Sequence, residues 1–269
     1  MKKFYYVTVA TKKSFITTYT QWALKSLIKT GVSPSEIHFI GKTKKDIKLV
    51  KKLVPYPINT HIVDEDLDKV KWKCFGGKRK YSLLKIAGLY KTFPKAEDGR
   101  CMVYFDGDVL WYKNPTEFLL TKCDKTWFHH GKELEKRATI DRCKVKLDDV
   151  DSLSKWTSLP AAYQMVKYGI KQLPEREIVA GFYLLHEQDH EKILKLTYEM
   201  TLDNTSRFVR HEGAGDQKPM NAALQVLDID WHGGSRFFCP EHKEYFDHFF
   251  GKKNMKDDFY KRAKKIGLM

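Results

Sequence analysis

Residues 101–110 read Cys101-Met102-Val103-Tyr104-Phe105-Asp106-Gly107-Asp108-Val109-Leu110. This apolar run stops at Asp-Gly-Asp and then resumes. Continuous apolar runs are typical of strands in parallel sheets, because helices cover both faces of such a sheet. Open α/β sheets bind their ligands just beyond the carboxyl ends of the strands. We therefore expect Asp106 and Asp108 to lie at a ligand site at the end of a buried strand.

The two carboxylates favour a divalent metal at this site. They would repel each other unless a cation neutralised them, and Gly107 between them lets the backbone approach closely. Carboxylate oxygens suit Mg2+ and Mn2+, which in turn hold a diphosphate. The competing interpretation is an Asp-Gly turn with solvated acids, which is the commoner origin of an isolated Asp-x-Asp. The buried strand before the turn favours the metal site.

The composition of the chain is that of an ordinary soluble globular protein. It has 269 residues, 42% of them hydrophobic and 31% charged, without an internal repeat or a low-complexity segment. No stretch approaches the roughly 20 apolar residues that span a bilayer, and the N-terminus lacks the apolar region of a signal peptide, so we expect a cytoplasmic protein. The five cysteines are odd in number and lack Cys-x-x-Cys spacing, which argues against a disulfide framework and a zinc site.

The formal net charge of +15 indicates a polyanionic partner: nucleic acid, an anionic membrane surface or a phosphorylated substrate. A lysine-rich solvated surface explains the same charge. The lysines are spread along the chain and no known nucleic-acid-binding module is present, so we expect no nucleic acid. Residues 254–269 form a basic tail that could be an amphipathic helix in peripheral contact with an anionic membrane, or a helix that packs its few apolar residues on the domain.

Strands and helices alternate in the first half of the chain. The periodicity predicts strands over 4–10, 37–40, 60–63 and 101–105, and helices over 19–29, 44–53 and 79–92. Alternation of this kind indicates a single α/β, Rossmann-like domain with a mostly parallel central sheet and helices on both faces.

The second half is less regular. It predicts a short helix after Asn114-Pro115, strands over 126–129 and 178–185, and helices over 191–202 and 217–226. Gly181 interrupts the strand over 178–185, which indicates a close approach of another group at that point. The polar residues 131–158 predict a mobile loop over the site.

Six segments resemble one protein family in the same order. They are Val7-Thr8-Val9-Ala10-Thr11, Lys85, Val103 to Leu110 with Asn114-Pro115 following, Ala180-Gly181-Phe182, Gly215-Asp216-Gln217-Lys218-Pro219-Met220-Asn221, and His248-Phe249-Phe250-Gly251-Lys252-Lys253. The chain resembles the nucleotide-sugar glycosyltransferases of GT-A fold, most closely the glycogenin and lipopolysaccharide galactosyltransferase group called glycosyltransferase family 8. It departs from that family at Val179, where Asn is usual, and in lacking a Trp after Lys253.

The resemblance implies a UDP-sugar donor, Mn2+ or Mg2+ as the metal, and roles for individual residues. It implies metal ligands at Asp106, Asp108 and His248, with His232 and His242 as the alternatives to His248. It implies contacts to the donor from Thr8, Ala10, Thr11, Lys85, Asp106, Gly107, Asp108 and Lys253. Imidazole nitrogen favours Mn2+ over Mg2+.

Asp216 and Gln217 are the catalytic candidates that the resemblance implies. Asp216 would bind hydroxyls of the transferred sugar, and Gln217 would lie where a retaining mechanism needs a polar group. If the reaction inverts, a carboxylate base must deprotonate the acceptor, and Asp216 or Glu212 is then the candidate. Asp216 is also a good helix N-cap, and both roles are compatible.

The sequence predicts a metal-dependent glycosyltransferase that moves a sugar from a UDP-sugar to a saccharide, protein or lipid-linked acceptor. Residues 1–253 would form the catalytic domain, with a nucleotide-binding half over 1–110 and an acceptor-side half over 111–253. One alternative is a sugar-phosphate nucleotidyltransferase, although residues 7–17 contain none of the glycines that its nucleotide loop needs. The other is a non-enzymatic basic protein that binds nucleic acid.

Overall fold

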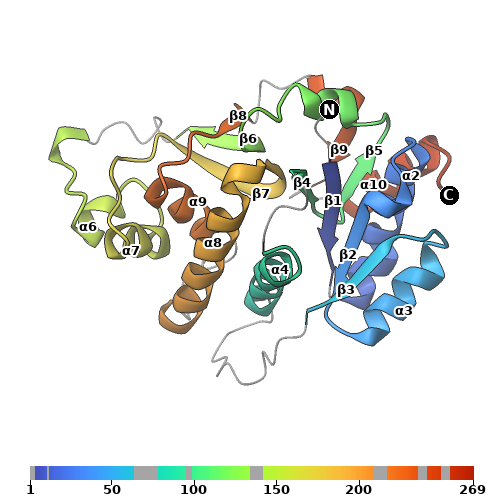
Figure 1. Cartoon of the computed structure of the whole chain (residues 1–269), viewed down its shortest axis with the longest axis horizontal. Coiled ribbons are helices and arrows are strands. Elements are labelled where there is room, and N and C mark those ends of the chain that lie inside the picture. Colours follow the sequence, from blue (N-terminus) through green and yellow to red (C-terminus); the bar gives the residue numbers. More distant parts are fainter. Residues whose placement is uncertain are drawn as a thin grey trace.

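The computed structural model describes residues 4–10, 12–63, 78–94, 99–133, 142–208, 217–235, 241–249 and 255–269. Within these residues a seven-stranded sheet has the strand order β3-β2-β1-β4-β7-β6-β8 (Figure 1). Its strands are β1 (Phe4–Val9), β2 (Ile37–Gly41), β3 (Asn59–Ile62), β4 (Cys101–Phe105), β6 (Trp127–Glu133), β7 (Arg176–Leu185) and β8 (His232–Ser235). Only β7 is antiparallel to its neighbours among these strands, so the prediction of a mostly parallel sheet is confirmed.

Helices cover both faces of the sheet, because the central strands are apolar on both sides. Along β1, Tyr6 faces one hydrophobic cluster and its neighbours Tyr5 and Val7 face the other. The first cluster includes residues of α2 (Gln21–Lys29) and α3 (Lys44–Leu53). The second includes residues of α4 (Lys78–Thr92), α8 (Glu187–Arg207) and α9 (Gln217–Val226).

A second, two-stranded sheet pairs β5 with β9. Strand β5 (Val109–Trp111) directly follows the Asp-Gly-Asp turn, and β9 (Phe246–His248) comes from the C-terminal part of the chain. Trp111 packs against Phe246 with ring centroids 5.2 Å apart, which joins this small sheet to the first hydrophobic cluster. The pairing therefore places a late segment of the chain beside the turn that bears the two carboxylates.

The remaining described elements connect and extend this core. They are α1 (Lys13–Phe15), the π-helical turn η1 (Ile16–Thr20), η2 (Pro34–Glu36), α5 (Thr116–Leu120), η4 (Arg142–Lys144), α6 (Val150–Leu153), α7 (Leu159–Lys167), η5 (Glu241–Glu244) and α10 (Met255–Lys265). Figure 1 shows α6 and α7 at one end of the long axis and α2, α3 and α10 at the other.

The prediction of a loop over residues 131–158 is wrong at β6 and α6, whereas residues 145–149 and 154–158 are turns and irregular structure. Strand β6 continues to Glu133, and α6 and α7 pack together in a third cluster through Leu153, Ala161 and Met165. Ser158 caps α7 by accepting a hydrogen bond from the backbone N–H of Ala161. The polar composition concealed α6 because this helix is a single short turn in which only Leu153 is buried.

The C-terminal helix α10 packs on the body of the protein. Phe259 and Ala263 are fully buried in a cluster with Leu110 and Phe249, so the apolar stripe of α10 is occupied by the domain. Its basic residues Lys261, Lys264 and Lys265 remain exposed. No helix among the described residues is long and apolar enough to cross a membrane.

Candidate metal centre

The turn between β4 and β5 presents the two carboxylates beyond the carboxyl end of β4. Asp106 donates its backbone N–H to the carbonyl oxygen of Gly181 at 2.8 Å, which extends the pairing of β4 with β7 by one residue. The N–H of Val109 then bonds the carbonyl oxygen of Asp106 at 3.2 Å and closes the turn. The backbone thus holds Asp106 and Asp108 at the edge of the sheet where the sequence predicts a ligand site.

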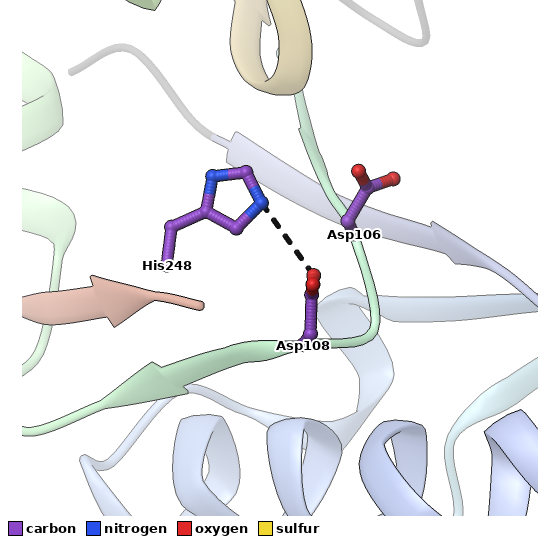
Figure 2. Close-up of side chains that lie close together, drawn as sticks. All are labelled: Asp106, Asp108 and His248. Carbon is purple, nitrogen blue, oxygen red and sulfur yellow. Dashed lines mark ion pairs between the residues drawn. The ribbon is translucent and has the colours of Figure 1, made fainter. Parts of the chain in front are cut away.

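His248 reaches the same place from β9. It is paired with Val109 in the two-stranded sheet, and the next residue, Phe249, donates its N–H to the carbonyl oxygen of Asp108 at 3.3 Å. Figure 2 shows the imidazole pointing at the turn, with its Nε2 3.5 Å from Asp108 Oδ1. Asp106, Asp108 and His248 each offer one ligand atom, and these atoms all lie within 4.8 Å of one another.

The three side chains fit a divalent cation. The side chains of His248 and Asp108 are only 1% and 7% exposed, and that of Asp106 is 24% exposed. Asp108 Oδ1 is buried and accepts no hydrogen bond from the residues that the structure describes. A buried carboxylate oxygen of this kind is costly unless a cation binds it. Two carboxylate oxygens and an imidazole nitrogen form a ligand set that suits Mn2+.

Gly181 leaves the space that this ligand set requires. A Cβ at this position would collide with Cε1 of His248 and would lie 2.9 Å from its Nε2 and 3.1 Å from Asp106 Oδ2. The strand is irregular here, because its pairing with β6 shifts register between Phe128 and His130. The close approach that the sequence predicts at Gly181 is therefore an approach to His248 and Asp106, two of the candidate metal ligands.

Gly107 has a different function in the structure. A Cβ there would collide with Thr20 Oγ1 and would lie 2.8 Å from Cε1 of Phe15. The glycine therefore allows the Asp-Gly-Asp turn to pack directly against α1 and η1. Its proposed contact with a donor stays a prediction.

Lys85 and Tyr104 both contact Asp106. Lys85, on α4, is 4% exposed, so its side chain is buried and not in solvent. Its Nζ lies 3.2 Å from Asp106 Oδ1 and donates to the carbonyl oxygen of Ala180 at 2.7 Å. The hydroxyl of Tyr104 donates to the same Oδ1 at 2.5 Å.

The charges around Asp106 act in opposite directions on its carboxyl group. Burial raises the pKa of Asp106 above its ordinary value, while the ammonium group of Lys85 opposes this rise. The neighbouring carboxylate of Asp108 raises the pKa further, and His248 and the hydrogen bond from Tyr104 lower it. A bound metal ion would lower the pKa of the Asp106 carboxyl group, because a carboxylate ligand has to be ionised.

Asn221 joins the first half of α9 to strand β7 by hydrogen bonds. The sequence did not reveal this role. Oδ1 of Asn221 accepts the backbone N–H of Ile178 at 2.7 Å, and its Nδ2 donates to the carbonyl oxygens of Ile178 at 3.2 Å and Gln217 at 2.9 Å. Strand β7 extends past the end of β4. On this edge of β7, Lys85 bonds the backbone at Ala180 and Asn221 bonds it at Ile178. The predicted catalytic residue Gln217 is the first residue of α9.

The other predicted residues lie as follows. Thr8 and Ala10, on β1 and at its end, are completely buried. Thr11, Glu212, Asp216 and Lys253 lie outside the described residues. His232 begins β8 and does not belong to the Asp106, Asp108 and His248 group. The roles of Thr8, Ala10, Thr11, Asp216, Gln217 and Lys253 stay predictions.

The sequence matches no protein-family model and no curated protein, whereas several solved structures share the fold. The galactosyltransferase LgtC in complex with donor and acceptor sugar analogs aligns with a TM-score of 0.54 and 15% identity, over 98% of this chain and 96% of that chain. Mouse xyloside xylosyltransferase 1 in its apo form aligns with a TM-score of 0.52 and 14% identity, over 86% of this chain and 85% of that chain. At these identities the likeness shows the fold, which is that of the GT-A glycosyltransferases.

Proposed function

We propose that this protein is a metal-dependent glycosyltransferase that moves a sugar from a UDP-sugar to a saccharide, protein or lipid-linked acceptor. The observation that best supports the proposal is the group formed by Asp106, Asp108 and His248, whose ligand atoms lie within 4.8 Å of one another. The group lies beyond the end of β4 in a chain of GT-A fold, at the edge of the sheet where α/β proteins bind ligands. Membership of glycosyltransferase family 8 is part of this proposal.

Different residues of the chain would have different roles in sugar transfer. A divalent ion held by Asp106, Asp108 and His248 would supply positive charge for the diphosphate leaving group. Lys85 lies 3.2 Å from Oδ1 of Asp106, and its positive charge opposes the rise in the pKa of Asp106 that burial causes. Lys253 would add a second positive charge at the diphosphate, as the resemblance implies. Gln217, at the start of α9, and Asp216 would contact the transferred sugar, as the resemblance implies.

The printed names of the similar structures support the reaction class. LgtC is described as a galactosyltransferase with donor and acceptor sugar analogs, and the mouse protein as a xyloside xylosyltransferase. Both names describe transfer of a sugar, which favours glycosyl transfer over the alternative of a sugar-phosphate nucleotidyltransferase. The choice of UDP rests on the resemblance of the sequence motifs.

The test is a screen of UDP-sugars, with GDP-sugars as the comparison, for release of the nucleoside diphosphate in the presence of Mn2+. We expect one donor to be turned over, and a chelator to stop the reaction. Asp106→Asn and Asp108→Asn should each abolish turnover, because each removes a charged ligand with little change of volume. The matched control is Asp148→Asn, which changes an exposed aspartate far along the chain. Turnover by either site variant at the rate of the control would refute the metal assignment.

A further inference from the structure

The two oxygens of the Asp106 carboxylate have different surroundings. Oδ1 accepts a hydrogen bond from the hydroxyl of Tyr104 at 2.5 Å and lies 3.2 Å from Nζ of Lys85. Oδ2 faces the space left by Gly181, since a Cβ on that glycine would lie 3.1 Å from Oδ2 and 2.9 Å from His248 Nε2. Oδ2 and the imidazole nitrogen therefore border the same small volume, while Oδ1 contacts two donors.

The ring of Tyr104 is held firmly in place. It is fully buried on β4 and stacks on Tyr183, with centroids 4.8 Å apart and planes 24° apart. Nζ of Lys85 lies 4.3 Å from the ring centroid, and the same Nζ is fixed by its bond to Ala180. A buried aromatic ring between two such contacts has little rotational freedom, so its hydroxyl has a fixed direction.

Tyr104 and Lys85 differ in what they do to Asp106. The ammonium group of Lys85 supplies a full positive charge and so competes with a cation for the carboxylate. The phenol of Tyr104 is a neutral donor, which orients the carboxylate and leaves its charge for a metal. Donors of this kind behind a metal ligand typically change metal affinity by 10- to 100-fold.

We propose that Tyr104 is a positioning residue for the metal centre, which holds Asp106 by Oδ1 so that Oδ2 faces the ion. The inference rests on the proposed function, because it takes Asp106, Asp108 and His248 to be the metal ligands. It adds that the orientation of Asp106 is set before the metal binds, by a residue two positions earlier on the same strand. The cost of ordering that carboxylate is then met during folding and not during metal binding.

The test is direct measurement of Mn2+ binding by titration calorimetry or by the electron paramagnetic resonance signal of free Mn2+. We expect Tyr104→Phe to weaken Mn2+ binding by about 10-fold, because it removes the hydroxyl and keeps the stacked ring. The matched control is Tyr5→Phe on the neighbouring strand, which removes a buried hydroxyl that lies 3.4 Å from His190 Nδ1. The control should bind Mn2+ within twofold of the wild type.

A rescue variant separates positioning from packing. Replacing Tyr104 by p-aminophenylalanine keeps a donor at the same place, so it should restore Mn2+ affinity to within about threefold of the wild type. Equal affinity of Tyr104→Phe and wild type, or a failed rescue in a variant whose circular dichroism shows a native fold, would overturn the role of Tyr104. Absence of Mn2+ binding by the wild type would overturn the proposed function as well, so the two failures are distinguishable.

Discussion

At the scale of single residues, Gly181 sets the distance between β7 and the side chains of His248 and Asp106. We expect Gly181→Ala to lower the free energy of unfolding by about 1–3 kcal/mol, since its Cβ would collide with the ring of the nearly buried His248. Mn2+ binding should be lost with it, because the ring has to move. Urea unfolding measures the first effect and calorimetric titration the second.

A double variant shows whether His248 is the cause. In a His248→Ala background the ring is absent, so Gly181→Ala should cost clearly less stability than it does in the wild type. Equal losses in the two backgrounds would mean that the glycine is required for the backbone of β7 itself.

His38 makes the stability of the fold depend on pH. The Nε2 of His61 lies 3.0 Å from His38 Nδ1. Burial, with smaller contributions from His61 and Arg100, lowers the pKa of His38 from 6.5 to about 4. Between these values the unfolded chain binds a proton that the folded chain does not, so stability falls as the pH is lowered from about 7 to 4. The loss from this group is about 3 kcal/mol. Urea unfolding across this range should show a shallower pH dependence for His38→Gln than for the wild type; identical slopes would exclude His38 as a source.

The residues that form the metal centre differ in how well the sequence reveals them. Asp106 and Asp108 could be predicted because an apolar strand that ends in two acids is a local pattern. His248 and Lys85 could be placed only through the resemblance, since no local pattern joins them to the turn. Tyr104 stands two residues before Asp106, yet its role depends on the direction of a hydroxyl that only packing determines.

At the scale of secondary structure elements, Asn221 joins α9 to the unpaired edge of β7. We expect Asn221→Ala to cost about 2 kcal/mol or more of unfolding free energy, because the buried N–H and carbonyl of Ile178 lose their partner. The control is Gln225→Ala, one turn later on the same helix and half exposed. Equal stability of the two variants in urea would contradict this role for Asn221.

Helix α10 packs on the domain, as one of the two sequence alternatives predicts, and the other alternative, contact with an anionic membrane, stays a prediction. Its apolar residues Phe259 and Ala263 are buried in the protein, so its exposed basic residues would make the contact, each contributing about 1 kcal/mol near anionic lipid. We expect the protein to sediment with anionic vesicles at low salt and to be released at high salt. Lys261→Gln, Lys264→Gln and Lys265→Gln together should abolish sedimentation and keep the melting temperature. Sedimentation of this triple variant like the wild type would refute a role for α10. Truncation before α10 is a poorer test, since it would expose Leu110 and Phe249.

At the scale of the whole molecule, the central parallel strands and their covering helices could be predicted, and the place of β7 could not. Hydrophobic periodicity is local, so it identifies β1, β2 and β4 with the helices between them. The insertion of β7 antiparallel to β4, and the pairing of β9 with β5, depend on contacts between distant segments. These two pairings place Gly181 and His248 at the Asp-Gly-Asp turn, so the site is completed by the part of the fold that local patterns do not specify.

Binding of the nucleotide, binding of the metal and stability of the fold should be coupled. UDP should raise the melting temperature only when Mn2+ is present, because the ion joins the diphosphate to Asp106, Asp108 and His248. A ligand at 100 times its dissociation constant stabilises the native state by about 2.7 kcal/mol, which corresponds to a shift of roughly 5–10 °C for a chain of this size.

Uridine, which lacks phosphates, is the control and should give no shift with or without Mn2+. His248→Ala should reduce the shift caused by UDP and Mn2+ together. A full shift by UDP in the presence of a chelator would show that the nucleotide binds without the metal centre, and would leave Asp106, Asp108 and His248 with a function other than holding the donor.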